Sequence, residues 1–552
     1  MERKVLKLIS DFNIDPLAGH MSGTADSNIS IEVAPFGQVR QLLAIDGSKP
    51  WGSVIWTLPE TTIPSFNKAL SFAEIIVEQC LDEVDIFAQT ILNYSADQPF
   101  TFVVNWALPP GYRGYGPLDW CPGLGIANLL AKMNLRLSEQ LSESGNTYVL
   151  DVNRWLLAAP RNAAPKMWYA AKVPYSSQVF GSAASDLISA MRAACGESRR
   201  LLVLDLDNTL WGGVVGETGL EGIRLGGHDH VGEAFRDFQS ELKALSTRGI
   251  QLAVVSKNDE QVALETIDKH PEMLLRRDNF AGWRVNWNDK AENIVSLVEE
   301  LNLGLSSVVF IDDNPAERDR VRGALPDVLV PEWPSDPALY VSSLRALDCF
   351  DAVAISKEDR DRTTMHKSEQ ARKASKAIVT SINDWLLDLK TKLCVNRITK
   401  LNITRVTQLI NKTNQLNLST RRLSEMEVLD WIAMENRSML AISVSDRFGE
   451  MGLVGIISVE AKGSKGQLVD FILSCRVMGR KIEEALIHLA MNELKRMNAV
   501  SIGARYIPTA RNCPTLDVFR VSILKETSEN YFEGDCMKGV PKPEAVAIEF
   551  FD

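Results

Sequence analysis

The chain has 552 residues, of which 45% are hydrophobic and 24% are charged, as is ordinary for a folded globular protein. This composition argues against wholesale disorder, and one domain per roughly 150 residues predicts about three to four domains. The 71 acidic residues outnumber the 60 Lys and Arg residues, and the formal net charge of -11 argues against a generally nucleic-acid-binding surface.

No run of 18 or more apolar residues appears, so we expect neither a membrane-spanning helix nor a membrane partner. The start of the chain, MERKVLKLISDFNIDPLAGH, lacks the long apolar core of a secretory signal. The eight cysteines are too sparse for a disulfide scaffold and include no CxxC pair, so we expect a cytoplasmic protein in a reducing compartment.

Residues 1–195 alternate apolar strands with helical stretches, which predicts an α/β layer fold. The stretch from Thr101 to Gly111 reads as a buried strand. The loop PPGYRGYGPLDWCPG, rich in Gly, Pro and aromatic residues, predicts a long excursion after that strand.

Residues 196–350 predict a second domain built on a parallel sheet. Four apolar stretches read as strands: ESRRLLVLDLDNT, Ile250 to Ser256, SSVVFIDDN and VLVPE. Apolar residues at helical spacing lie between them, namely Val231, Phe235, Phe238, Leu242 and Leu245 in one helix and Ile294, Leu297, Val298 and Leu301 in another. Apolar strands separated by amphipathic helices indicate a sheet covered on both faces.

Residues 351–383 are strongly charged and predict a solvated helical linker. Residues 384–552 mix helices and strands. The stretches SMLAISVSDRFG, LVGIISVEAKG and QLVDFILSC predict three consecutive strands, and VMGRKIEEALIHLAMNELKRM predicts a long helix after the third.

Carboxylates gather at the predicted carboxyl ends of two strands in the second domain. Asp205 and Asp207 end the first strand in LDLDNT, and Asp312 and Asp313 end another. Ligands bind beyond such strand ends in open parallel sheets, so we expect one shared pocket. One carboxylate of a D-x-D pair can attack a phosphoryl group, and the second can protonate the leaving group and later activate water. Asp205 with Asp312 and Asp313 also suits Mg²⁺.

Three further residues complete this pattern. Thr209 would order the loop, the Ser256 hydroxyl would hold a phosphoryl oxygen, and Lys290 would neutralise charge on the transferring group. Each feature alone has an ordinary explanation: a turn for the D-x-D pair, a helix cap for Ser256 and a solvated first-turn position for Lys290. The order of all of them within about 110 residues favours the functional interpretation.

This order resembles the haloacid dehalogenase (HAD) superfamily of phosphohydrolases, over Arg200 to Trp333. The resemblance implies a Rossmann-like parallel sheet domain. It implies that Asp205 is the nucleophile and that Asp207 is the acid/base. It also implies that Ser256 supplies the phosphoryl-binding hydroxyl and that Lys290 is the motif lysine, with Lys257 as a rival for the lysine role. It also implies a Mg²⁺ site formed by Asp205, Asp207, Asp312 and Asp313. The segment between Asp207 and Val231 is too short for a large cap domain, so we expect a site open to a bulky or protein-borne substrate.

Cys475 lies between the predicted strand QLVDFILS and the long helix that follows. A thiol beside a helix N-terminus and arginines can be nucleophilic, and a buried structural cysteine is the alternative. Arg476, Gly479 and Arg480 predict an anion cradle at the same helix N-terminus. This R-x-x-G turn resembles the coenzyme A pyrophosphate loop of GNAT acyltransferases and implies a GNAT-like α+β domain. Lys481 stands where that loop has Gly or Ala, so a phosphopantetheine arm on a carrier protein is the alternative ligand.

Longer strings between Glu197 and Phe519 are similar to the FkbH-like family: LDLDNTLWGGVVGETG, VSKNDE, FIDDNPAERDRVR, NKTNQLNLSTRR, SDRFGEMGLVG and SCRVMGR. The resemblance implies a glyceryl transferase-phosphatase. Such proteins take a glyceryl unit from 1,3-bisphosphoglycerate, remove its phosphate and load it on an acyl carrier protein for polyketide or related assembly. An acyl phosphate is a reactive acyl donor, so Cys475 would accept the group as a thioester before the carrier thiol takes it.

Polar residues near this loop are candidates for holding glyceryl hydroxyls or phosphates, namely Asn414, Gln415, Asn417, Arg421 and Arg422. A capped loop with solvated arginines is the alternative explanation for them. Asp446, Arg447 and His488 could serve in acyl transfer, although His488, within a helix, fits a packed position as well.

Full-length members of this family often carry an SGNH-hydrolase-like domain, and the resemblance implies one at residues 1–195. The active-site pattern differs, because Ser10 lies in ISDFN rather than in G-D-S and Arg154 in DVNR stands where D-x-x-H has His. We therefore expect an SGNH-like α/β sandwich without hydrolase activity, which docks the carrier protein or covers the HAD site.

The predicted architecture is an α/β multidomain protein with an SGNH-like domain (1–195), a HAD-like domain (196–350), a linker (351–383) and a GNAT-like domain (384–552). Three alternatives to glyceryl transfer stay open. A plain Mg²⁺-dependent HAD phosphatase with a structural GNAT-like domain would not need Cys475. A non-catalytic protein that recruits a carrier would not need the complete aspartate set. An acyltransferase could use another acyl donor.

Overall fold

The computed structural model describes residues 4–23, 28–45, 50–142, 144–158, 165–227, 229–301, 303–353, 372, 375, 381–399, 402–413, 416–509, 512–538 and 541–551. The chain forms two compact units, one of Met1–Asp278 with Gly282–Ile355 and the other of Asn279–Ala281 with Ser356–Asp552. Each unit is described by itself below. Among the described residues, no helix combines the length and the apolarity needed to cross a membrane.

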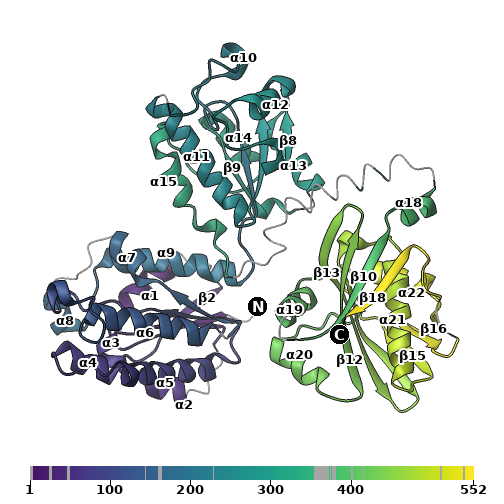
Figure 1. Cartoon of the computed structure of the whole chain (residues 1–552), viewed down its shortest axis with the longest axis horizontal. Coiled ribbons are helices and arrows are strands. Elements are labelled where there is room, and N and C mark those ends of the chain that lie inside the picture. Colours follow the sequence, from purple (N-terminus) through teal and green to yellow (C-terminus); the bar gives the residue numbers. More distant parts are fainter. Residues whose placement is uncertain are drawn as a thin grey trace. The chain divides into compact units, whose positions relative to one another are not determined.

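The first sheet has five parallel strands in the order β2-β1-β3-β4-β5, with helices on both faces (Figure 1). Its strands are β1 (Lys4–Ser10), β2 (Ile29–Val33), β3 (Gly52–Trp56), β4 (Thr101–Val104) and β5 (Thr147–Leu150). Its helices are α1 (Asp15–Ser22), α2 (Val39–Ile45), α3 (Pro59–Thr62), α4 (Pro64–Leu70), α5 (Val77–Ser95), η1 (Gly116–Leu118), α6 (Ile126–Leu141), α7 (Val152–Ala158), α8 (Pro165–Ala171) and α9 (Ser177–Ala194). The predicted α/β layer fold of this region is confirmed.

Alternating side chains of these strands enter two separate hydrophobic cores. Val54 and Trp56 of β3 pack with α1 and α9, whereas Ile55 between them packs with α5 and α6. Successive side chains of a strand point to opposite faces, so a strand covered on both faces must be apolar throughout. This explains the continuous apolar runs in the sequence.

The second sheet has four strands in the order β8-β7-β6-β9. Its strands are β6 (Leu201–Leu204), β7 (Gln251–Ser256), β8 (Phe280–Val285) and β9 (Val308–Ile311), and β6 pairs in parallel with β7 and β9. The helices are α10 (Val215–Thr218), α11 (His230–Thr247), α12 (Glu260–Lys269), η2 (Arg277–Asn279), α13 (Lys290–Glu300), η3 (Leu305–Ser307), α14 (Pro315–Ala324), η4 (Pro337–Leu339), α15 (Tyr340–Arg345) and η5 (Asp348–Phe350). The predicted parallel sheet is confirmed.

One strand prediction for this sheet was wrong, and one observed strand was not predicted. The stretch VLVPE forms only an isolated bridge, in which Leu329 pairs with Val309. Pro331 follows two residues later and has no N–H to donate to a ladder. Strand β8, in contrast, was not predicted, because FAGWRV contains a glycine and few β-branched residues. Gly282 lets the Leu297 side chain approach, since a Cβ there would lie 2.9 Å from Leu297 Cδ1.

The third sheet belongs to the second unit and is mostly antiparallel, in the order β16-β17-β15-β14-β13-β12-β10-β18, with β11 beside β14. Its strands are β10 (Thr391–Arg397), β11 (Leu416–Asn417), β12 (Arg437–Asp446), β13 (Gly449–Lys462), β14 (Lys465–Leu473), β15 (Ser501–Arg505), β16 (Lys525–Ser528), β17 (Tyr531–Asp535) and β18 (Val546–Phe551). The predicted run of three consecutive strands is confirmed in β12, β13 and β14.

Helices cover both faces of this third sheet (Figure 1). The helices of the second unit are α18 (Ile382–Asp388), α19 (Ile403–Lys412), α20 (Glu425–Ile432), η6 (Cys475–Val477), α21 (Ile482–Arg496) and α22 (Cys513–Val521). Ala441 and Ile456 pack with α19 and α20, whereas Ile442 and Ile457 pack with α21. The predicted long helix is confirmed as α21. Most of the predicted linker helix, 351–383, lies outside the described residues.

Candidate active site

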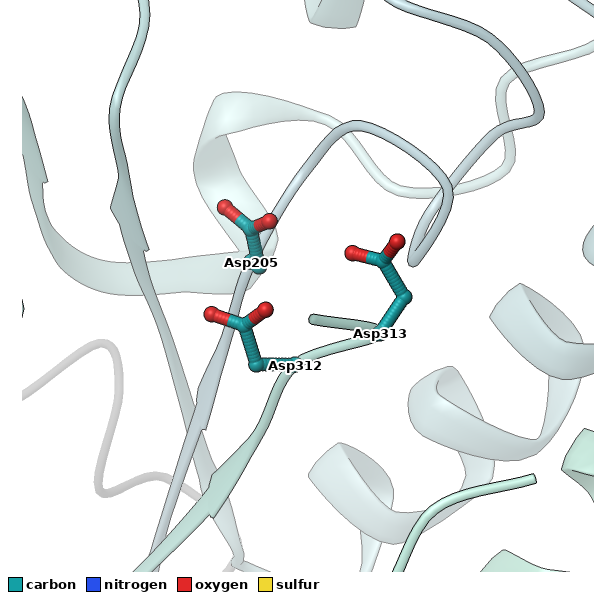
Figure 2. A group of neighbouring side chains, drawn as sticks. All are labelled: Asp205, Asp312 and Asp313. Atoms are coloured by element: carbon teal, nitrogen blue, oxygen red, sulfur yellow. The ribbon is translucent and has the colours of Figure 1, made fainter. Parts of the chain in front are cut away.

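Three of the four predicted carboxylates, those of Asp205, Asp312 and Asp313, meet at one edge of the second sheet, as Figure 2 shows. Asp205 follows β6, and Asp312 and Asp313 follow the neighbouring strand β9. The Asp205 N–H donates to the Ile311 carbonyl at 3.0 Å, which fixes the two strand ends side by side. Ser256 is the last residue of β7, on the other side of β6. Parallel strands bring their carboxyl ends to the same edge, so one site receives residues far apart in the sequence.

One oxygen from each of Asp205, Asp312 and Asp313 lies within 4.8 Å of the others. Burial, with the nearby charge of Asp205, raises the pKa of Asp312 to about 6 and also raises the pKa of Asp313. Close carboxylates out of water repel one another, and a cation between them relieves that repulsion.

Lys290 supplies one positive charge at this cluster. Its Nζ lies 2.6 Å from Asp312 Oδ2 and 3.1 Å from Asp205 Oδ1. Burial of this ammonium opposes its charged form, but the carboxylates of Asp205 and Asp312 outweigh burial and raise the pKa of Lys290. Three carboxylates against one ammonium leave the site short of positive charge. Asp205 Oδ1 is buried, and among the described residues its ion pair with Lys290 is not accompanied by a hydrogen bond. An oxygen cluster of this charge fits a hard divalent cation.

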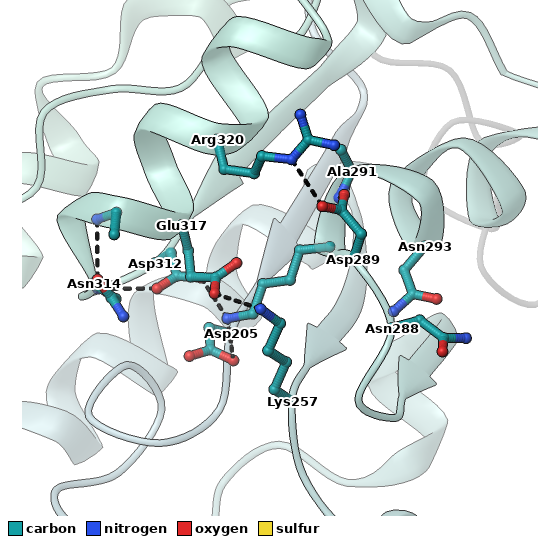
Figure 3. A network of polar contacts seen from close by, with 12 residues as sticks. Asp205, Lys257, Asn288, Asp289, Ala291, Asn293, Asp312, Asn314, Glu317 and Arg320 are labelled. Atoms are coloured by element: carbon teal, nitrogen blue, oxygen red, sulfur yellow. Dashed lines mark hydrogen bonds and ion pairs between the residues drawn. The ribbon is translucent and has the colours of Figure 1, made fainter.

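The position of Lys290 follows from the way α13 begins. Lys290 is the first residue of that helix, and Asp289 caps it by accepting hydrogen bonds from the N–H groups of Ala291 (2.8 Å) and Glu292 (3.3 Å). The second Asp289 oxygen accepts from Arg320 Nε at 2.8 Å (Figure 3). The lysine is therefore not the solvated first-turn residue of the alternative interpretation, because it is buried.

The rival residue, Lys257, has a different partner. Its Nζ lies 2.6 Å from Glu317 Oε1, and 38% of its side chain is exposed (Figure 3). The structure thus pairs Lys290, and not Lys257, with the aspartates.

Asp207 lies outside the group of three carboxylates, which differs from its predicted place among the metal ligands. Its Oδ1 accepts from Trp211 Nε1 at 2.8 Å and from the Val215 N–H at 3.1 Å, and its Oδ2 accepts from Asn258 Nδ2 at 2.9 Å. Trp211 and Val215 lie in the segment after β6 and Asn258 follows β7, so the carboxylate is held between these two segments. Burial raises its pKa.

Thr209 and Arg318 support the strand ends. Thr209 is fully buried, and its hydroxyl accepts from the Asp313 N–H at 3.3 Å, in line with its predicted role in ordering the loop. Arg318 donates to the carbonyls of Asp312 and Asp313, both at 2.8 Å. Sequence reasoning missed Arg318, together with Trp211, Asn258 and Asp289. The signal for Trp211, Asn258 and Arg318 was their place in the strings LDLDNTLWGG, VSKNDE and FIDDNPAERDR, and the signal for Asp289 was its place directly before Lys290.

The polar candidates of the third sheet are held by other protein groups. The fully buried Asn417 donates to the Thr413 carbonyl at 3.0 Å, Arg421 forms an ion pair with Asp470, and Arg422 donates to the Ile410 carbonyl at 2.6 Å. Asn414 and Gln415 lie outside the described residues. Arg421 is half-buried beside Asp470, whereas Arg422 is exposed, as the alternative explanation of solvated arginines expects.

Asp446 is also internal to the fold. Its side chain is completely buried and forms ion pairs with Arg372 at 2.6 Å and Arg480 at 3.5 Å. Arg447 forms an ion pair with Asp388 at 2.7 Å, and His488 Nε2 lies 2.9 Å from Asn492 Nδ2. The predicted acyl-transfer roles of Asp446, Arg447 and His488 thus remain without a shared site among the described contacts.

The predicted anion cradle is partly occupied by the chain itself. The Gly479 N–H donates to Glu483 Oε1 at 2.6 Å, Arg480 donates to the Arg476 carbonyl at 2.8 Å, and Arg476 Nε donates to Ser474 Oγ at 3.3 Å. Cys475 begins η6, between β14 and α21, and its side chain is outside the described part of the structure. Lys481 adopts φ 63°, a left-handed conformation that explains why Gly suits this position.

In the first sheet, the structure gives Ser10 no exposed position. It ends β1 with 1% of its surface exposed, and its hydroxyl accepts from the Phe12 N–H at 3.1 Å. The adjacent Asp11 accepts from the Leu58 N–H at 3.0 Å and from the Thr61 hydroxyl. Burial outweighs these hydrogen bonds and raises the pKa of Asp11 to about 6. Arg154 lies 3.6 Å from Asp186.

Comparison with known proteins found no matching family model and no matching curated protein. Among solved structures, the chain is similar to the N-terminal part of the protein BF1531 from Bacteroides fragilis, which contains a phosphatase domain and is complexed with Mg. The identity is 28%, the TM-score is 0.57, and the match covers 64% of this chain and 94% of that one. The chain is a multidomain α/β protein with parallel sheets.

Two further solved structures match parts of the chain. A domain from Methanocaldococcus jannaschii DSM 2661 is 19% identical, with a TM-score of 0.23, over 26% of this chain and 99% of that one. The GNAT domain of S. lividans PAT is 15% identical, with a TM-score of 0.21, over 26% of this chain and 89% of that one.

Proposed function

We propose that the protein is a Mg²⁺-dependent phosphohydrolase of HAD type. The observation that carries the proposal is the cluster of Asp205, Asp312 and Asp313 around Lys290, with Asp207 held two residues beyond Asp205. The similarity to a structure with a phosphatase domain complexed with Mg supports it. Mg²⁺ held by the three aspartates would neutralise phosphoryl oxygens.

In this reaction the Asp205 carboxylate attacks phosphorus while the bond from phosphorus to the leaving oxygen breaks. Asp207 donates a proton to that oxygen and then takes a proton from the water that hydrolyses the aspartyl phosphate. Lys290 stabilises the ionised carboxylates of Asp205 and Asp312 through its two ion pairs. The Ser256 hydroxyl binds a phosphoryl oxygen. Phosphate leaves, and Asp205 and Asp207 return to their starting states.

We further propose that this phosphatase serves glyceryl transfer. Cys475 would take a phosphoglyceryl group from 1,3-bisphosphoglycerate as a thioester, with release of phosphate, and an acyl carrier protein would receive the glyceryl group on its phosphopantetheine thiol. The long sequence strings similar to the FkbH-like family support this assignment, as does the place of Cys475 between β14 and α21. The third sheet would then act as a GNAT-like acyltransferase domain.

The first sheet would be an SGNH-like domain without hydrolase activity. Its strand order and the burial of Ser10 support that assignment. A role in docking the carrier protein fits this arrangement, and a cytoplasmic location fits the sparse cysteines of the sequence.

Intact-protein mass after incubation with 1,3-bisphosphoglycerate and Mg²⁺ tests both steps. The expected result is a thioester-labile glyceryl adduct on the wild type, no adduct on Cys475→Ala, and an adduct that keeps its phosphate on Asp205→Asn. Cys513→Ala is the matched control, because this exposed cysteine also lies next to a helix N-terminus.

A parallel incubation with simple phosphate esters and Mg²⁺, read beside the adduct experiment, separates the alternatives. Release of phosphate from simple esters without any adduct would support a plain phosphatase and leave Cys475 structural. Absence of both adduct and phosphate release would refute the enzymatic proposal.

A further inference from the structure

The carboxylate of Asp207 is held from three directions. Trp211 Nε1 and the Val215 N–H donate to Oδ1 at 2.8 Å and 3.1 Å, and Asn258 Nδ2 donates to Oδ2 at 2.9 Å. Trp211 is completely buried and Asn258 is 5% exposed. Hydrogen bonds between groups out of water are stronger than exposed ones and resist reorientation.

The two carboxylate oxygens differ in the number of donors that they contact. A carboxylate oxygen accepts about two hydrogen bonds, one on each lone pair. Oδ1 already has two donors, whereas Oδ2 has one among the described contacts. Oδ2 is therefore the oxygen with an acceptor position left for a reacting group.

The orientation of the Asn258 amide follows from its other contact. Its Oδ1 accepts from the Asp259 N–H at 2.9 Å, at the beginning of α12. A backbone N–H can only donate, so the amide oxygen must face Asp259 and the NH₂ group must face Asp207. Asn258 thus connects the end of β7 to the acid that follows β6.

We propose that Trp211 and Asn258 are positioning residues, which hold Asp207 so that Oδ2 alone faces the oxygen that leaves phosphorus. This inference rests on the proposed phosphatase function. As the bond between Asp205 and phosphorus forms, the bond to the leaving oxygen breaks and that oxygen takes the proton from Asp207 Oδ2. The water that later attacks phosphorus returns a proton to the same oxygen.

The need for this proton depends on the leaving group. An alkoxide such as that of glycerol is strongly basic and must be protonated as it leaves, whereas p-nitrophenolate is stable without a proton. Loss of the correct Asp207 orientation should therefore slow the cleavage of alkyl phosphates far more than the cleavage of p-nitrophenyl phosphate.

The test compares kcat/KM of the full chain with Mg²⁺ for glycerol 3-phosphate and for p-nitrophenyl phosphate, because kcat/KM reports the steps up to release of the first product. Trp211→Phe and Asn258→Leu remove one donor each. We expect kcat/KM for glycerol 3-phosphate to fall about 100-fold, which is the size of effect that misplaced catalytic groups produce. For p-nitrophenyl phosphate we expect kcat/KM to fall less than about 3-fold.

Trp283→Phe is the matched control, because Trp283 Nε1 also donates to a carboxylate, Glu260 Oε1 at 3.0 Å, away from Asp207. It should leave both values unchanged. Circular dichroism reports folding, and Asn258→Leu decides the matter if Trp211→Phe does not fold.

Equal losses of kcat/KM for the two esters would overturn the inference. A purely structural role would lower the fraction of folded enzyme or misalign the whole site, and both effects would act on the two esters alike. Unchanged kcat/KM for glycerol 3-phosphate in both variants would overturn it as well. A wild type that hydrolyses neither ester would instead refute the proposed phosphatase function on which the inference rests.

Discussion

Replacement of Lys290 by Met should destabilise the second sheet strongly when no divalent cation is present. The Lys290 side chain is 4% exposed and lies between the carboxylates of Asp205 and Asp312, whose side chains are 10% and 0% exposed. Met keeps most of the aliphatic stem but removes the charge. The variant therefore leaves two buried carboxylates facing each other without their ammonium partner.

The magnitude follows from the burial of this cluster. Removal of one partner from a buried ion pair costs about 3–5 kcal/mol, because the remaining charge is buried without compensation. In a domain of this size, that loss lowers the unfolding midpoint by on the order of 10 °C. A divalent cation held by Asp205, Asp312 and Asp313 would restore much of the missing positive charge, so Mg²⁺ should raise the midpoint of Lys290→Met more than that of the wild type.

The assay is thermal unfolding of the full chain in EDTA and in Mg²⁺, with hydrogen exchange of peptides from β6 and β9 to locate the effect. Lys257→Met is the matched control, because it removes an ion pair with Glu317 whose lysine is 38% exposed. Such a pair contributes about 1 kcal/mol or less. Equal midpoints for Lys290→Met and Lys257→Met in EDTA would refute the argument that burial makes the Lys290 contacts essential.

Three other predictions concern stability. Asp289→Ala removes the cap of α13 and should cost about 1 kcal/mol, measured by urea unfolding. Asp446→Asn leaves two buried guanidinium groups without their carboxylate and should lower the free energy of unfolding by about 3–5 kcal/mol. Arg372→Met should lower it less in the same assay, because Arg480 still faces Asp446. Because the pKa of Asp11 rises from 3.8 when unfolded to about 6 when folded, the folded state binds more protons between these values, and stability falls as pH rises from about 4 to 7. In Asp11→Asn, the difference between the free energies of unfolding at about pH 4 and at about pH 7 should be smaller than in the wild type by up to about 3 kcal/mol.

The aspartate site could be predicted from the sequence because its geometry is set by local pattern. Asp205 and Asp312 each follow an apolar strand, and parallel pairing brings such ends together whatever the intervening chain does. The direction of the Asp207 side chain could not be predicted in this way. It depends on donors from Trp211 and Asn258, whose positions are known only once the segment after β6 and the end of β7 are folded.

The polar candidates of the third sheet show a second limit. Arg421 is of a residue type that often binds phosphate. Its partner in the structure is instead the buried carboxylate of Asp470, which lies about fifty residues later in the chain, on strand β14. Asp446 is paired with Arg372 in the same way. A charged residue looks the same in the sequence whether its partner is a ligand or a distant part of the protein.

The outer neighbour of β10 is β18, which pairs with it in parallel from Thr391 beside Val546 to Asn396 beside Phe551. The hairpins that join β12, β13 and β14 are local and can form early, but β18 is synthesised roughly 150 residues after β10, an interval on the order of 10 s during translation. Throughout that interval, β10 has an unpaired edge that another chain could join. The nascent second unit is therefore most exposed to aggregation before β18 docks, and chaperones that bind open strand edges would protect it at that stage.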